Sequence, residues 1–169
     1  MRIVEKKVSA GNGDIFGLDE FLSRPLYAHL AHYSQKGPCE SPVWFHWDGR
    51  AIWIIGGTTF PANLKRHPAC ALGIVDWDLA TGRSHHVGIR GRAEILPFDG
   101  AMAQTIFRRY FGPDEKDWDH RFDDVFTGEL GLEMVRIIPD TIVMRDQSYT
   151  PSRWAAQQGA LRPQPAMTR

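Results

Sequence analysis

Residues Ser41–Pro68 read SPVWFHWDGRAIWIIGGTTFPANLKRHP, which predicts a strand, a tight turn, a second strand, a loop and a short helix. Asp48-Gly49 separates two β-rich runs and favours a two-residue hairpin turn, because Asp and Gly accept positive φ at low cost. Such a turn would place Trp44 opposite Trp53. Both faces of this ribbon are apolar, so we expect core on one side and a ligand or a second subunit on the other.

Composition and charge indicate one globular domain. The chain has 169 residues, of which 43% are hydrophobic, and its formal net charge is zero. We expect a single domain over residues 1–169 with an ordered core at about 18–146, followed by a mobile tail at 149–169. A neutral chain lacks the electrostatic footprint of a nucleic-acid binder, so no nucleic acid is expected as a partner.

Hydropathy favours a cytoplasmic location. The longest apolar runs, such as residues 51–55, are far shorter than the roughly 20 residues that span a bilayer. The first residues lack the apolar core of a signal peptide. We therefore expect a cytoplasmic protein without a membrane partner.

The residue types that bind metals are poorly placed for that role. His85 and His86 are neighbours in an expected strand, so their side chains point to opposite faces and do not readily hold one ion. The aspartates at 114–124 lack the spacing of a calcium loop and are expected to be a solvated face. Cys39 and Cys70 form no CxxC pair and are expected to be free thiols. We expect no metal site.

The remaining sequence adds further strands and a few helices. Gly88 and Gly91 lie in a long expected strand and indicate a bulge or the close approach of another backbone. Asp99 is placed to cap a helix that ends at Gly112. We expect strands at 26–33, 41–47, 51–55, 69–76, 85–96, 132–138 and 141–146, helices at 18–23, 59–67 and 99–111, and an irregular acidic segment at 114–131.

The order of these elements points to a known family. The segment PLYAHLAHYSQKGPCESPVWFHWDGRAIWIIGGTTFPANLKRHPACALGIVDW, followed by VGIRGRAEIL, resembles the pyridoxamine 5′-phosphate oxidase-like split β-barrel proteins, which are FMN- or deazaflavin-binding homodimers. The resemblance covers about residues 21–146. It implies a mainly β fold, a split antiparallel β-barrel of six to seven strands, and a homodimer.

The resemblance also implies a cofactor site at the dimer interface, with the flavin ring against the hairpin. The residues that would line the ring are Pro42, Val43, Trp44, Phe45, Ile54 and Ile55. The residues that would approach the phosphate, or supply charge and hydrogen bonds near the flavin, are Thr58, Thr59, Asn63, Lys65, Arg90 and His86. Gly56-Gly57 and the following helix start suit the close approach of an anion. An aromatic ribbon is also common as core or dimer contact, and this alternative stays open.

One departure from the family pattern bears on the cofactor. Family members commonly place Ser/Thr-Arg-Lys where this chain has Thr58-Thr59-Phe60, so Lys65, Arg66 or Arg90 would have to supply the cations. No nucleophile elbow, P-loop or dinucleotide fingerprint appears, so any chemistry is borrowed from a cofactor. We expect an FMN-dependent oxidoreductase acting on an unknown small substrate. The alternatives are a deazaflavin-dependent reductase and a cofactor-free ligand-binding or sensing dimer.

Overall fold

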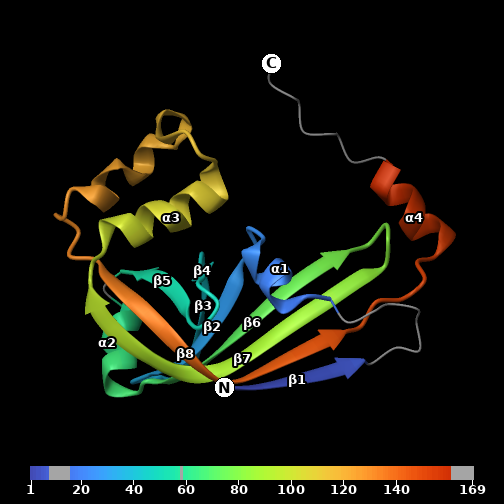
Figure 1. Ribbon diagram of the computed structural model, residues 1–169, viewed down its shortest axis with the longest axis horizontal. Helices are drawn as coiled ribbons and strands as arrows, with labels where there is room; N and C mark the ends of the chain where they lie inside the picture. The colour runs from blue at the N-terminus through green and yellow to red at the C-terminus, as the bar shows by residue number, and fades with distance from the viewer. Residues whose placement is uncertain (8–15, 58, 161–169) are drawn as a thin grey trace.

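The computed structural model describes residues 1–7, 16–57 and 59–160, and shows a sheet of eight strands that curls around a core (Figure 1). The strands are β1 Arg2–Lys7, β2 Ala28–Ser34, β3 Gly37–Val43, β4 His46–Trp47, β5 Ile52–Gly56, β6 Ala69–Asp78, β7 Arg83–Pro97 and β8 Glu133–Asp146. The helices are α1 Leu18–Ser23, α2 Thr59–Arg66, α3 Gly100–Phe111 and α4 Arg153–Ala160, with 3₁₀ turns η1 Glu115–Asp117 and η2 His120–Phe126.

The strand order is that of a mainly antiparallel split barrel. Neighbours in the sheet run β3-β2-β6-β7-β8-β5-β4, and β1 joins β8 as a parallel partner. The fold class predicted from the sequence is therefore confirmed, although the sheet has eight strands rather than six or seven. β1 was not predicted, because residues 2–7 hold only two apolar side chains, Ile3 and Val4, which are adjacent and so show no period of two.

The β4–β5 hairpin has a different register from the one predicted. His46 lies opposite Trp53, so Asp48–Ala51 form a four-residue loop, and the two-residue turn was wrong. Gly49 takes a φ of +89°, but Asp48 does not have positive φ. Instead, Asp48 Oδ1 accepts the backbone N–H groups of the last two loop residues at 2.8 and 2.7 Å. The register shifts by two residues, so every side chain keeps the face expected from the sequence.

β8 is one continuous strand where two were predicted. The register of β7 against β8 shifts between Arg90 and Gly91, so Asp140 bulges out of the ladder beside Pro139. A bulge absorbs the proline, which has no N–H to donate. A Cβ atom at Gly91 would lie 2.3 Å from the carbonyl oxygen of Ile138. The close backbone approach predicted at Gly91 is therefore confirmed.

Two segments for which the sequence predicted no regular secondary structure contain helices. The acidic segment forms η1 and η2, which Asp114 and Asp119 cap through their side chains, while its aspartates stay exposed. Helix α4 lies in the segment predicted to be a mobile tail, and Ala155 is buried there at 4% exposure. The rest of that tail, residues 161–169, lies outside the described residues.

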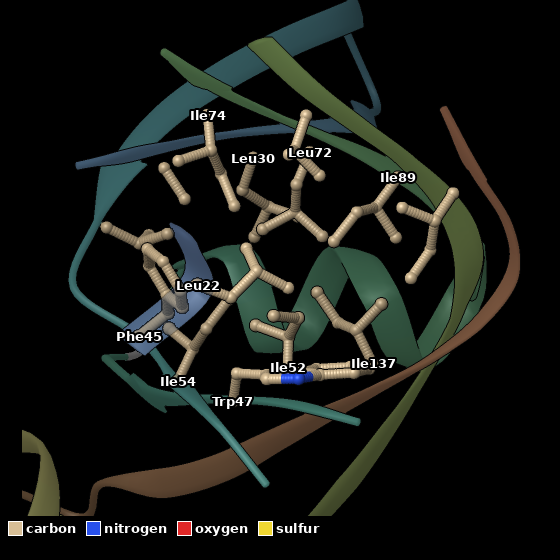
Figure 2. Close-up of a cluster of buried hydrophobic side chains, with 14 of the residues drawn as sticks. Leu22, Leu30, Phe45, Trp47, Ile52, Ile54, Leu72, Ile74, Ile89 and Ile137 are labelled. Carbon is tan, nitrogen blue, oxygen red and sulfur yellow. The ribbon is translucent and has the colours of Figure 1, made fainter. Parts of the chain in front are cut away.

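The core fills the space enclosed by the curled sheet. Helix α2 lies behind this cluster, and its Leu64 is fully buried (Figure 2). The cluster includes fully or nearly fully buried side chains from six strands, from α1 and from the link between β3 and β4, namely Leu22, Leu30, Phe45, Trp47, Ile52, Ile54, Leu72, Ile74, Ile89 and Ile137. Burial of this apolar surface is the main stabilising term of the fold.

The bulge gives a direct test of the β7–β8 junction. We expect Gly91→Ala to lower the free energy of unfolding by about 2 kcal/mol or more, because the added methyl group collides with a backbone oxygen. Gly100→Ala is the matched control, since its Cβ would meet nothing within 4 Å and alanine favours the helix. Urea denaturation of both variants measures the difference. Equal stability of the two would show that the bulge has room to relax.

Candidate functional site

A cavity of about 420 Å³ opens between the hairpin strands and the helical segment that follows β7. In Figure 1, α3 and the turns after it lie over β5, β4 and β3. No charged side chain is among the described residues that line the cavity. These residues are Tyr27, Pro42, Val43, Trp44, Ile55, Gly57, Phe60, Ile106, Phe107, Phe122, Val125, Leu130 and Leu132.

The structure brings part of the predicted ring-binding set together in this cavity. Pro42, Val43, Trp44 and Ile55 line it. Ile54 does not, because it alternates with Ile55 along β5 and so faces the other side of the sheet. Phe45, in the link between β3 and β4, does not line the cavity either. Both are core residues, Phe45 at 0% and Ile54 at 1% exposure (Figure 2).

Trp44 is the centre of an aromatic cluster that the sequence did not reveal. Its ring stacks on Tyr110, with centroids 5.3 Å apart and planes at 22°. Phe107, Phe111 and Phe122 approach the indole edge-on, with centroids 5.1 to 6.0 Å away. One signal was present, since Trp118, Phe122 and Phe126 recur every four residues within the acidic segment and indicate an apolar face.

Two residues of α3 hold the helical segment over the hairpin. The Tyr110 hydroxyl donates to the Leu26 carbonyl at 2.7 Å and accepts the Phe45 N–H at 3.2 Å. Burial raises the pKa of Tyr110, so the hydroxyl stays protonated. Arg109 donates to the carbonyls at the end of α1, at Leu22 and Arg24, and its guanidinium lies 4.5 Å from the centroid of the Phe45 ring. The carbonyls that the end of α1 leaves unpaired are thereby satisfied.

The glycine pair before α2 has two separate roles. A Cβ atom at Gly56 would lie 2.5 Å from Pro61 Cγ, so this glycine is required for packing of the strand against α2. A Cβ at Gly57 would meet nothing within 4 Å, and Gly57 borders the cavity. The loop therefore presents open backbone to the cavity at Gly57.

The residues predicted to approach a phosphate are spread around α2. Thr59 is exposed at the first position of the helix, and Thr58 lies outside the described residues. Asn63 is 8% exposed, and its Oδ1 accepts a hydrogen bond of 3.5 Å from Arg66. The Lys65 ammonium pairs with Glu133 at 2.6 Å, on the surface. The structure therefore shows no cation in the wall of the cavity among its described residues.

His86 and Arg90 lie elsewhere, in a second hollow of about 240 Å³ on the sheet. Gly73 and Gly88, which are opposite each other on β6 and β7, form part of its lining, and Arg145 joins from β8. Arg145 Nη1 lies 3.0 Å from His86 Nδ1. Guanidinium has only donors, so this nitrogen accepts and the imidazole is neutral.

The electrostatics of the second hollow agree with this assignment. Burial, and then the nearby Arg145 charge, lower the pKa of His86. The hollow shares no lining residue with the hairpin cavity. Within one chain, the predicted site residues that the structure describes are therefore divided among the cavity wall, the core, the surroundings of α2 and the second hollow.

Two wider searches of the described residues bear on the sequence expectations. No group of three or more His, Cys, Asp or Glu side chains is placed to hold a metal ion in the part of the chain that the structure describes. Within the same residues, no helix combines the length and apolar character that a membrane span requires.

The fold defines the class of protein to which this chain is related. It is the split β-barrel of the pyridoxamine 5′-phosphate oxidase-like proteins, as the sequence resemblance predicted. An F420 reductase is similar at 28% identity, with a TM-score of 0.56, over 75% of this chain and 96% of its own.

Two further solved structures show the same fold. A conserved hypothetical protein from Mycobacterium tuberculosis has a TM-score of 0.63 and 20% identity over 95% of this chain and 98% of its own. A Listeria innocua protein provisionally named pyridoxamine 5′-phosphate oxidase has a TM-score of 0.54 and 20% identity over 74% and 92%. No protein-family model matches the sequence, and no curated protein matches it at a significant level.

The two roles of the glycine pair predict that alanine lowers the free energy of unfolding at Gly56 and leaves it nearly unchanged at Gly57. Gly56→Ala is expected to cost about 1–3 kcal/mol of unfolding free energy, because the methyl group overpacks against Pro61. Gly57→Ala is expected to leave stability within about 0.5 kcal/mol, because its methyl group meets open space. Thermal unfolding of the two variants tests this. A greater loss at Gly57 would contradict the assignment.

Proposed function

We propose that the protein binds a flavin-type cofactor, with the tricyclic ring in the hairpin cavity, and acts as an oxidoreductase. The observation that carries the proposal is the cavity itself, whose apolar and aromatic walls enclose about 420 Å³. Small-molecule sites commonly measure about 300–1,000 Å³ and are lined mainly by apolar side chains. A planar, largely apolar ring system suits these walls.

The chain's contribution is to bind the ring and keep water away from it. Pro42 and Trp44 form one wall, and Ile55 with the open backbone of Gly57 forms another. Phe107 and Phe122 close the cavity from the helical segment. A bound flavin supplies hydride transfer, which no side chain in this cavity supplies by itself.

The anionic end of the cofactor needs donors from two sources. In this proposal the first N–H groups of α2 and the Thr58 and Thr59 hydroxyls receive the phosphate. Cations come from a second subunit. We propose a homodimer in which the second hollow of one chain, with His86, Arg90 and Arg145, faces the cavity of the other. The apolar outer residues of the sheet support this, since Val75 and Trp77 are 50% and 53% exposed.

FMN is the cofactor favoured by the sequence, and a deazaflavin is the second candidate. The observation that favours the deazaflavin is the similarity to an F420 reductase at 28% identity. The missing Arg-Lys pair, which family members commonly carry after the loop, weakens the case for FMN but does not by itself separate the two cofactors. Both cofactors present a similar ring to the cavity.

Titration of the purified protein with FMN and, separately, with F420 distinguishes these candidates. We expect micromolar or tighter binding of one of them, seen as quenching of the ligand's fluorescence. Trp44→Ala is expected to weaken this binding about tenfold, because an aromatic contact with the ring is lost. Trp154→Ala is the matched control, since Trp154 is 64% exposed on α4 and is a lining residue of neither hollow. If neither ligand binds, a cofactor-free binding or sensing role replaces the proposal.

The dimer and its cations have their own test. We expect Arg145→Gln to weaken cofactor binding about tenfold while light scattering still shows a dimer, because a charge-assisted contact is lost. Arg92→Gln is the control, since Arg92 is exposed on the same strand as Arg90 but is not a lining residue of the second hollow. A stable monomer at micromolar concentration would contradict the dimer. Unchanged affinity in Arg145→Gln would contradict the role of the hollow.

A further inference from the structure

A cysteine and a buried histidine face each other across the β2–β3 hairpin, outside both cavities. His32 on β2 is the direct cross-strand partner of Cys39 on β3. The Cys39 sulfur lies 3.4 Å from Nδ1 and 3.5 Å from Nε2 of the imidazole. In either tautomer one ring nitrogen without a proton lies within 3.5 Å of the sulfur, and the thiol also lies 3.5 Å from the His32 carbonyl oxygen, to which it can donate.

His32 is unusual for a histidine in this fold because it is 5% exposed. Its Nε2 also lies 3.4 Å from Ser41 Oγ, so the imidazole sits between a thiol and a hydroxyl. Cys39 is half-buried, and β3 lies at the end of the sheet order. A thiol that is accessible and paired with an imidazole has the features of a reactive cysteine.

The second cysteine of the chain is half-buried as well, but its contacts are different. Cys70 lies in β6, and its sulfur approaches the Gly91 carbonyl oxygen at 3.8 Å. Burial, and then the charge of Asp140, raise the pKa of Cys70 to about 12. The chain therefore contains its own inert reference thiol.

We propose that Cys39 is a modification site for hydroperoxides and that His32 is the base that activates it. His32 takes the proton from the thiol, and the sulfur attacks one peroxide oxygen. The O–O bond breaks, the sulfur is oxidised to a sulfenic acid, and the leaving oxygen takes the proton back from His32. In the net reaction, one thiol and one hydroperoxide give one sulfenic acid and one molecule of alcohol or water.

The modified cysteine lies close to the hairpin cavity. The ring of His32 is 6.2 Å from that of Phe60, which lines the cavity. Pro42 and Val43, also in the cavity wall, belong to the same strand as Cys39. An oxygen atom added to the Cys39 sulfur needs space beside His32. We therefore expect oxidation to displace the His32 ring toward Phe60 and so to alter this wall of the cavity. The assignment of the thiol itself does not depend on the proposed function.

The experiment compares each cysteine in the folded and the unfolded chain. Iodoacetamide labelling at pH 7 is followed by mass spectrometry of the peptides that contain Cys39 and Cys70, with and without urea. Unfolding exposes every thiol, so a merely shielded cysteine reacts faster in urea. We expect Cys39 to be labelled about fivefold faster in the folded chain than in urea. We expect Cys70 to be labelled faster in urea than in the folded chain.

Variants and a peroxide assay complete the test. His32→Gln is expected to remove the excess reactivity of folded Cys39, while His29→Gln, on the exposed face of the same strand, retains it. Hydrogen peroxide followed by dimedone should label Cys39 and not Cys70. Slower labelling of Cys39 in the folded wild-type chain than in urea would overturn the proposal even if His32→Gln fails to fold. Dimedone labelling of neither cysteine would overturn it as well.

Discussion

The hairpin from Val43 to Ile55 carries apolar side chains on both faces, and each face has to be removed from water. The inner face packs into the barrel, where Phe45, Ile52 and Ile54 are almost fully buried. The outer face carries Trp44, which α3 and η2 cover with an aromatic cluster. This second cover is incomplete, and the cavity lies where it fails to close. The candidate site is therefore a consequence of the same burial requirement that builds the core.

The position of that cover depends on polar contacts rather than on the aromatic rings alone. Arg109 and Tyr110 reach the backbone at the end of α1 and at the start of the hairpin. Arg109 supplies a partner for the Leu22 carbonyl and a second one for the Arg24 carbonyl, which also accepts the Leu26 N–H at 2.8 Å. Leaving a buried acceptor unpaired costs about 1–3 kcal/mol. Helix α3 is thereby fixed relative to two segments that lie far from it in the sequence, which sets the width of the cavity.

Charge is kept away from the hairpin cavity within one chain. Lys65 is paired with Glu133, while Arg90 and Arg145 lie in a separate hollow with His86. The Cys39–His32 pair is a third chemical environment, under Phe60 at the edge of the sheet. An apolar cavity, a cationic hollow and a thiol–imidazole pair are thus distributed over one curled sheet. A bound cofactor or a second subunit would have to bring the apolar cavity and the cationic hollow together.

The sequence by itself determined most strands of the barrel, the alternation of faces along them, the cap at Asp99 and the bulge at Gly91. These are local properties, set by a period of two, by turn chemistry and by the space that a glycine leaves. It also indicated four residues of the cavity wall. Only the tertiary structure decided that Phe45 faces the core, that β8 runs unbroken past Pro139, and that an acidic segment supplies the roof of the cavity. Those outcomes depend on which distant surfaces meet, and the contacts that fix them join residues tens of positions apart, where local pattern carries no information.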